Sequence, residues 1–332
     1  MCRMQPVYVT RPAMNRLLSA RSTAYPILPA AVAALIVACS GSPRPDHPPL
    51  VVFNAGALAL PLRAALDSFA PSHGYGVSQE NAGSVETIRK ISDLGRVPDV
   101  VAVADTALFA RLIPGRLTGP IALLGSSRLV LAYTDRSRFA DEVTARNWPD
   151  VTTRQGVQVG RSDPTLDPAG YRALMAMQLA ERYYKRPGLA ARLRAAASTA
   201  NVRPKSADLV ALLQTGNLDY AWEYESVARK LGLRFVNLPR EVDLGDPTLA
   251  TTYYVASVDI SSPSSGSRSG GASQAPLVMH GAPIVFGAGV PKDAPHAEAA
   301  HQFITFLMSP EGRSILVASG LQPVGVAAAD TR

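Results

Sequence analysis

The most constraining feature of the chain is a repeated unit in which an apolar run ends in a small-residue turn and a helical pattern follows. Leu50–Phe53 is such a run, closed by Asn54-Ala55-Gly56, and apolar residues then recur at helical spacing as far as Phe69. A second unit passes through Asn81-Ala82-Gly83-Ser84, and Asp99–Val103 begins a third. Alternating strands and helices of this kind predict an α/β fold.

The later part of the chain predicts a second set of strands and helices. Ser127–Tyr133 is an apolar strand suited to carry the chain between lobes, and residues 135–283 follow with their own elements. Within them, Ser261–Ser273 is rich in Ser and Gly and is expected to be a mobile surface loop. A returning strand is expected at Ala282–Val290 and a last helix at Ala297–Met308. We therefore expect two α/β lobes that the chain enters more than once.

The N-terminal residues 1–38 have the pattern of an export signal. They contain four arginines and no acidic residue, and they end in the apolar run Pro26–Ala38. As a helix that run would extend roughly 20 Å, less than the hydrocarbon core of a bilayer. Ile36-Val37-Ala38-Cys39 is similar to a bacterial lipobox, in which the cysteine is lipidated and becomes the new N-terminus. We expect a lipoprotein signal peptide over 1–38, a lipid anchor on Cys39 and a flexible tether over 39–48; the alternative is an ordinary signal peptide.

Composition and charge exclude several classes of protein. Of the 332 residues 47% are hydrophobic and 18% charged, which is a globular composition. The formal net charge is +7, but the arginines of residues 1–38 account for four of those charges, so the basic balance does not indicate a nucleic-acid partner. Cys2 and Cys39 are the two cysteines, and both precede the expected globule. A disulfide framework or a thiolate metal site is therefore excluded.

Three strand-to-helix turns are candidate anion sites. They are Asn54–Ala57, Asn81–Ser84 and Asp163–Gly170, and each delivers the N-terminus of an expected helix. Unpaired backbone N–H groups and the positive end of the helix dipole attract anions at such a position. Two of these turns also have a structural interpretation: Ser84 as an ordinary N-cap, and Asp167-Pro168 as an N-cap followed by a proline in the first turn.

A further polar cluster lies at Tyr220–Ser226. If this segment is extended, Glu223 and Glu225 share one face and Tyr224 lies on the other; the alternative is a solvated acidic edge. The five histidines lack the spacing of metal ligands, and no sequence pattern pairs a nucleophile with a base. These residues favour a binding protein over an enzyme.

Taken together, the ordered segments resemble the extracytoplasmic molybdate/tungstate-binding proteins of ABC importers, in particular the tungstate-type branch. The resemblance runs from about residue 50 to 326. It rests on Val52–Gly56, Ala82–Val85, Arg89–Ile91, Asp99–Asp105, Leu131–Asp135, Gly160–Pro164, Asp167–Arg172, Glu223–Ala228, Gly281–Val285 and Ser309–Gly312.

This resemblance implies a type II periplasmic-binding-protein fold with a hinge and a ligand cleft between two lobes. Lobe 1 would comprise 49–128 plus 285–332, and lobe 2 would comprise 129–284. It also implies a monomer without a cofactor, held outside the cytoplasm by its lipid anchor. Such a protein delivers molybdate or tungstate to an ABC permease and binds no nucleic acid.

The resemblance further implies which residues meet the oxyanion. Ala57 stands where the family usually has serine, Ser84 matches the second serine, Ala169 would offer its backbone N–H, and Asp167 would be one carboxylate ligand. The second carboxylate would be Glu223 or Glu225, which the sequence leaves open, and Tyr224 is a further candidate. The metal contacts would thus come from Asp167 with Glu223 or Glu225.

The placement of carboxylates next to a doubly charged anion needs a physical explanation, because like charges repel. At about 4 Å and an effective dielectric near 20, each pair of like unit charges costs about 4 kcal/mol. Molybdenum and tungsten in the +6 state can offset this cost by accepting the carboxylates as extra oxygen ligands, whereas the sulfur of sulfate cannot. Two alternatives stay open: a receptor for sulfate, thiosulfate or phosphate, and an enzyme on the same fold with Asp167 or Glu223 as general acid or base.

Overall fold

The structure is a computed structural model that describes residues 47–261 and 276–324. The predicted signal peptide, the lipid anchor on Cys39, nearly all of the tether and most of the 261–273 segment lie outside the described residues. Among the helices of the described ranges, none is both long and apolar enough to cross a bilayer.

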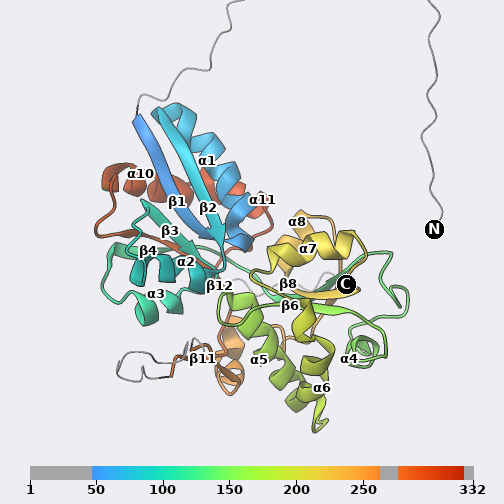
Figure 1. Ribbon diagram of the computed structural model, residues 1–332. Helices are drawn as coiled ribbons and strands as arrows, with labels where there is room; N and C mark the ends of the chain where they lie inside the picture. The colour runs from blue at the N-terminus through green and yellow to red at the C-terminus, as the bar shows by residue number, and fades with distance from the viewer. Residues whose placement is uncertain (1–46, 262–275, 325–332) are drawn as a thin grey trace, which may run out of the picture. The chain divides into compact units, whose positions relative to one another are not determined.

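Lobe 1 is built on a five-stranded sheet in the order β2-β1-β3-β12-β4 (Figure 1). β1 pairs in parallel with β2 and β3, whereas β12 runs antiparallel to β3 and β4. The strands are β1 (His47–Ala55), β2 (Tyr75–Ala82), β3 (Val100–Val103), β4 (Leu117–Ser126) and β12 (Val285–Pro291). The helices are η1 (Gly56–Leu58), α1 (Ala59–His73), α2 (Ser84–Ser92), α3 (Ala107–Leu112), α10 (Ala297–Met308) and α11 (Pro310–Ala318).

Lobe 2 is built on a second five-stranded sheet in the order β7-β6-β8-β5-β9. Its strands are β5 (Leu129–Tyr133), β6 (Val159–Ser162), β7 (Val202–Arg203), β8 (Tyr220–Tyr224) and β9 (Arg234–Asn237). Its main helices are α4 (Trp148–Thr152), α5 (Pro168–Tyr183), α6 (Leu189–Ala196), α7 (Ala207–Gln214) and α8 (Glu225–Lys230). Shorter elements complete it: η2 (Thr199–Asn201), η3 (Pro247–Leu249), α9 (Ala250–Tyr253) and the ribbon of β10 (Ser257–Asp259) with β11 (Val278–His280).

The central strands explain why the chain forms these sheets. Every residue of β3 and of β5 is buried, and both strands are uninterrupted apolar runs. Such runs are typical of strands covered on both faces, as in α/β proteins. The predicted α/β fold is confirmed.

The chain passes between the lobes at two neighbouring places. β4 ends at Ser126 and β5 starts at Leu129, while the return connection runs from β11 to β12. Near the C-terminus, the N–H of Ser126 donates to the carbonyl of Gln322 at 2.7 Å, and the N–H of Gln322 donates back at 3.0 Å. The connections between the lobes are therefore hydrogen-bonded to the end of the chain.

In lobe 1, β4 and α11 were not predicted. β4 contains Gly119 and Pro120, which weaken the strand pattern, but β4 is an edge strand and tolerates a proline there. The helix over 297–308 is confirmed, but it is not the last one, because α11 starts directly after Ser309, whose side chain caps it. Ser309 followed by a proline is an ordinary helix-start signal that the expectation of a last helix overlooked.

Candidate functional site

The turn before α2 in lobe 1 meets the loop before α5 in lobe 2. The backbone N–H groups of Val85 and Glu86 donate to the carbonyl of Leu166 at 3.0 and 3.2 Å. A Cβ added to Gly83 would lie 2.3 Å from that carbonyl oxygen and 3.1 Å from the Cβ of Asp167. Glycine is therefore required at 83 for this approach, and two of the three candidate turns lie side by side.

Ser84 is the first residue of α2 and is fully buried. Its hydroxyl accepts a hydrogen bond from the backbone N–H of Ala104 at 2.9 Å, at the end of β3. The N-cap of α2 is Gly83, and no side chain caps the helix, so the N-cap interpretation of Ser84 is wrong. The hydroxyl hydrogen has no acceptor within the described part of the chain and is free to donate to a ligand.

Asp167 is the buried N-cap of α5, as its sequence context predicted. Its Oδ1 accepts from the N–H of Ala169 at 3.2 Å, and its Oδ2 accepts from the N–H of Ser206 at 2.7 Å. Burial raises the pKa of Asp167 to about 6, and these two backbone hydrogen bonds limit the rise. The carboxylate therefore joins the start of α5 to the start of α7.

Glu223 lies in β8 and is almost fully buried. Its Oε1 accepts from the N–H of Tyr224 at 2.8 Å, whereas its Oε2 has no hydrogen-bond partner of ordinary geometry in the part of the chain that the structure describes. Burial raises the pKa of Glu223 to about 8; the Tyr224 N–H opposes the rise, and the negative charge of Asp167 adds to it. The two carboxyl groups are thus close enough to affect each other's ionisation.

Among the described residues, several buried polar atoms around this pair of acids have no hydrogen-bond partner of ordinary geometry. They include Oε2 of Glu223 and the hydroxyl oxygens of Ser162, at the end of β6, and Ser206, just before α7. The hydroxyls of Ser206 and Ser162 nevertheless lie close enough to Glu223 and Asp167, respectively, to lower the pKa values of these acids through weak hydrogen bonding. An unsatisfied buried polar group costs about 1–3 kcal/mol, so such a concentration indicates a place built for a polar ligand.

Three further residues predicted to meet the oxyanion are Ala169, Tyr224 and Ala57. The N–H of Ala169 is already bonded to Asp167, and the hydroxyl of Tyr224 accepts from Arg172 at 3.0 Å. Ala57 lines a small cavity between the lobes together with Gly56, Ala207 and Ser226. The first turn thus faces the same helix start, that of α7, which supplies the Ser206 contact.

Glu225 is held differently from Glu223. Its two carboxylate oxygens accept from Nε and Nη2 of Arg128 at 2.9 and 3.1 Å, and Arg229 and Gln322 donate to them as well. The expected shared face does not exist, because β8 ends at Tyr224 and Glu225 begins α8. Glu225 therefore anchors the connection between the lobes, where Arg128 lies, and its oxygens are fully used.

Sequence reasoning missed Ser162 and Ser206 as members of the site. Ser206 stands directly before an apolar helical pattern, which is an N-cap signal, but nothing in the sequence pairs it with Asp167 across 39 positions. Ser162 belongs to a segment that was used only as part of the family resemblance.

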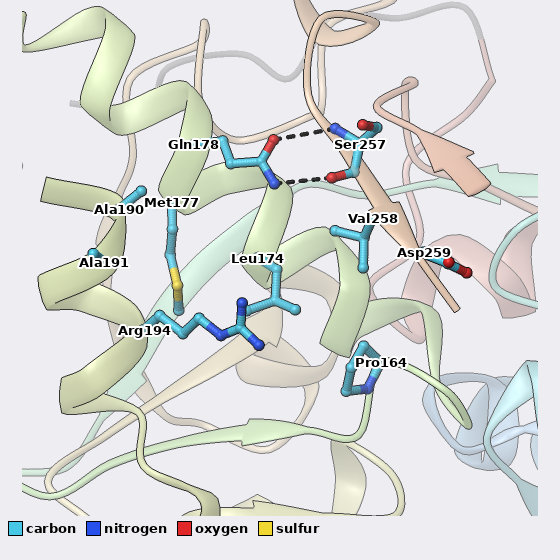
Figure 2. Close-up of a pocket in the computed structure, with 10 residues that line it drawn as sticks. All are labelled: Pro164, Leu174, Met177, Gln178, Ala190, Ala191, Arg194, Ser257, Val258 and Asp259. Atoms are coloured by element: carbon cyan, nitrogen blue, oxygen red, sulfur yellow. Dashed lines mark hydrogen bonds between the residues drawn. The ribbon is translucent and has the colours of Figure 1, made fainter. Parts of the chain in front are cut away.

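A larger cavity lies away from the paired acids. It has a volume of about 570 Å³ between α5, α6 and β10, and it is lined by residues that include Leu174, Met177 and Arg194 (Figure 2). Gln178 joins α5 to β10 there through hydrogen bonds of 2.9 and 3.1 Å with the main chain of Ser257. Neither Asp167 nor Glu223 lines it, so this cavity and the cluster of unpaired polar atoms are different places. Within the described ranges, His, Cys, Asp and Glu side chains form no group of three or more that could hold a metal ion.

Comparison with known proteins now identifies the family. Residues 50–322 match the bacterial extracellular solute-binding proteins. The chain belongs to this family. The molybdate/tungstate-binding protein WtpA of Pyrococcus abyssi is 33% identical over 316 residues, covering 86% of this chain and 88% of that protein. The resemblance stated from the sequence is confirmed.

Solved structures share the fold of this solute-binding protein. The sulfate-binding protein SubI from Mycobacterium tuberculosis H37Rv has a TM-score of 0.60 at 15% identity, covering 85% of this chain and 88% of that one. The periplasmic molybdate-binding protein of Azotobacter vinelandii has a TM-score of 0.57 at 16% identity, covering 81% and 97%. They confirm the two-lobed type II periplasmic-binding-protein fold. The protein is a solute-binding protein of the ABC importer type, and its family is one of transport proteins rather than enzymes.

Proposed function

We propose that this solute-binding protein captures molybdate or tungstate between its lobes, with Asp167 and Glu223 as oxygen ligands of the metal. The observation that carries the proposal is the pair of buried carboxyl groups, one of which has an oxygen with no hydrogen-bond partner of ordinary geometry among residues 47–261 and 276–324. The names of curated relatives such as WtpA support the same ligand class.

Glu223 is the better second ligand than Glu225. Both oxygens of Glu225 are occupied by the guanidinium of Arg128, and recruiting them to a metal would break this buried ion pair. Among the described residues, Oε2 of Glu223 has no hydrogen-bond partner of ordinary geometry, and it lies beside the hydroxyl of Ser206. Ser84, Ser162 and Ser206 would donate hydrogen bonds to the oxygens of the anion, and lobe closure would bring these donors and the acids together.

The paired acids would also select the ligand. A sulfate or phosphate ion would meet negative charge with no compensating bond, because its central atom accepts no further oxygen. Molybdate and tungstate would gain two metal–oxygen contacts in return for the same repulsion. Specificity would thus arise from repulsion of the wrong anions as much as from attraction of the right ones.

Because the pKa of Glu223 is raised, we expect ligand binding to be coupled to the release of a proton. At pH 7 a carboxyl group with a pKa of about 8 is mostly protonated in the ligand-free protein. Coordination to the metal requires the carboxylate, so binding should release that proton and affinity should increase as the pH rises from 6 to 8. If the neutral acid instead donated a hydrogen bond to the anion, affinity would decrease as the pH rises through 8.

Titration calorimetry with tungstate, molybdate, sulfate and phosphate tests the proposal. Glu223→Gln and Asp167→Asn should each weaken tungstate binding by about a hundredfold, about 3 kcal/mol, and should improve sulfate binding. Glu86→Gln, a partly exposed carboxyl group on α2, is the matched control. X-ray absorption on the tungstate complex should show oxygen neighbours additional to those of the free anion.

Two outcomes would contradict the proposal. A wild-type protein that prefers sulfate, thiosulfate or phosphate would be a receptor for another oxyanion. Unchanged tungstate affinity in both variants would show that the two carboxylates do not bind the metal. Turnover of a small-molecule substrate that depends on Asp167 or Glu223 would instead support an enzyme.

We further propose that the mature protein is a monomer, anchored to the membrane by a lipid on Cys39, that delivers its oxyanion to an ABC permease. The lipobox-like segment before Cys39 supports the anchor, and the family supports the transport role. Mass spectrometry of the N-terminal peptide from a bacterial membrane fraction should show the lipid. Cys39→Ser should release the protein from that fraction; retention would contradict the anchor.

A further inference from the structure

A buried arginine on α5 crosses from lobe 2 to lobe 1. Nη1 of Arg172 donates to the carbonyl of Ala104 at 2.6 Å and to the hydroxyl of Tyr224 at 3.0 Å. Its Nη2 lies 3.2 Å from Oδ2 of Asp105, which also accepts from the hydroxyl of Tyr171 at 2.6 Å. We call Asp105, Tyr171, Arg172 and Tyr224 the Arg172 cluster.

This cluster touches both halves of the proposed oxyanion site. On the side of lobe 1, Ala104 accepts from Arg172 through its carbonyl and donates through its N–H to Ser84. On the side of lobe 2, Tyr224 accepts from Arg172 through its hydroxyl and donates through its N–H to Glu223. A single guanidinium is therefore bonded to the neighbours of the serine and of the glutamate.

The charge of Arg172 is placed to offset the acids. Its positive charge lowers the pKa of Asp167, against the rise that burial causes. A site that holds two carboxyl groups and receives a dianion accumulates negative charge, and a buried cation next to it reduces that cost. An arginine suits this role because it keeps its charge when buried and because its planar fork holds several acceptors at once.

We infer that Arg172 is a positioning residue for the oxyanion: through Asp105, Ala104 and Tyr224 it sets the alignment in which the closed lobes present Ser84 and Glu223, and it supplies positive charge to the closed site. This inference rests on the proposed function, because the alignment matters only for a ligand held between the lobes.

Another arginine between the lobes offers a matched control. Arg89 of α2 donates to the carbonyls of Thr165 and Ile260, both at 3.3 Å, and so also joins lobe 1 to lobe 2. Within the described residues, its guanidinium makes no hydrogen bond with Ser84, Asp167 or Glu223. If the loss of any contact between the lobes weakened tungstate binding, Arg89→Gln would also bind more weakly. If Arg172 acts by positioning the site, Arg89→Gln should keep its affinity.

The experiment compares Asp105→Asn, Arg172→Lys and Arg89→Gln by calorimetry with tungstate and by hydrogen–deuterium exchange. Asp105→Asn loses the ion pair with Arg172, and Arg172→Lys loses charged hydrogen bonds worth about 1.5–3 kcal/mol each, so both variants should bind tungstate about tenfold or more weakly. Arg89→Gln should stay within about threefold of wild type. With tungstate bound, exchange in Asp105→Asn should increase at 83–86, 104–106 and 166–172 and stay unchanged in β1 and β5.

Wild-type affinity in both Asp105→Asn and Arg172→Lys would overturn the inference, as would weaker binding with faster exchange throughout both sheets. If Arg172→Lys does not fold, Asp105→Asn decides, because its amide keeps an acceptor for Tyr171. If wild type binds neither molybdate nor tungstate, the proposed function fails. Ligand-free exchange in Arg172→Lys then still tests the alignment: unchanged rates at 104–106 and 166–172 would refute it.

Discussion

Replacing Glu223 by glutamine should remove a pH-dependent loss of stability from the ligand-free protein. The ordinary pKa of this side chain is 4.5, and burial raises it to about 8 in the folded state. Between these two values the folded protein holds a proton that the unfolded chain has released. Stability therefore decreases as the pH rises from 4.5 to 8 and is constant above 8.

The size of the effect follows from the two pKa values. One pKa unit corresponds to about 1.4 kcal/mol, so the penalty in wild type amounts to about 1 kcal/mol at pH 5, about 3 kcal/mol at pH 7 and about 5 kcal/mol at pH 9. Glutamine has nearly the same shape and does not titrate. Asp167, with a pKa of about 6, titrates in both proteins and largely cancels from the comparison.

Calorimetric melting of wild type and Glu223→Gln from pH 5 to 9, in buffers without oxyanions, measures this difference. For a chain of this size 1 kcal/mol corresponds to about 2–4 °C in Tm, so the advantage of the variant should increase by roughly 10 °C between pH 5 and pH 9. Glu86→Gln, at a partly exposed position, should follow wild type at every pH. Parallel curves for wild type and Glu223→Gln would show that Glu223 ionises freely and would refute the reasoning.

Two further substitutions probe the lobe interface. Gly83→Ala should abolish tungstate binding, because its Cβ would lie 2.3 Å from the backbone oxygen of Leu166 and would push the two lobes apart at this contact; calorimetric binding equal to wild type would show that the contact is not needed for binding. Ala57→Ser adds a hydroxyl to the cavity that Ala57 shares with Ala207 and Ser226, and it should strengthen tungstate binding about fivefold, the value of one net hydrogen bond. An unchanged or weaker affinity would show that this turn does not face the anion.

Much of the fold could be predicted because its signals are local. The apolar runs of β1, β3 and β5 and the helical pattern of α10 each lie within one segment, and the structure contains all four. The capping role of Asp167 was also predictable, since an acidic residue before a proline is a local signal. β4 was missed because its Gly and Pro oppose strand formation unless the strand lies at an edge, and edge position is a tertiary property.

Some features of the candidate site are likewise local and could be predicted, whereas others depend on the tertiary structure. The sequence by itself indicated that two glutamates stand close together in a polar cluster, that Asp167 begins a helix and that Gly83 and Ser84 form a turn before another helix. Only the tertiary structure decided that Glu225 pairs with Arg128, 97 positions away, while Glu223 keeps an oxygen that has no hydrogen-bond partner of ordinary geometry among the described residues. The physical reason is that propensity and capping act between near neighbours, whereas burial and charge pairing depend on which distant segments the fold brings into contact.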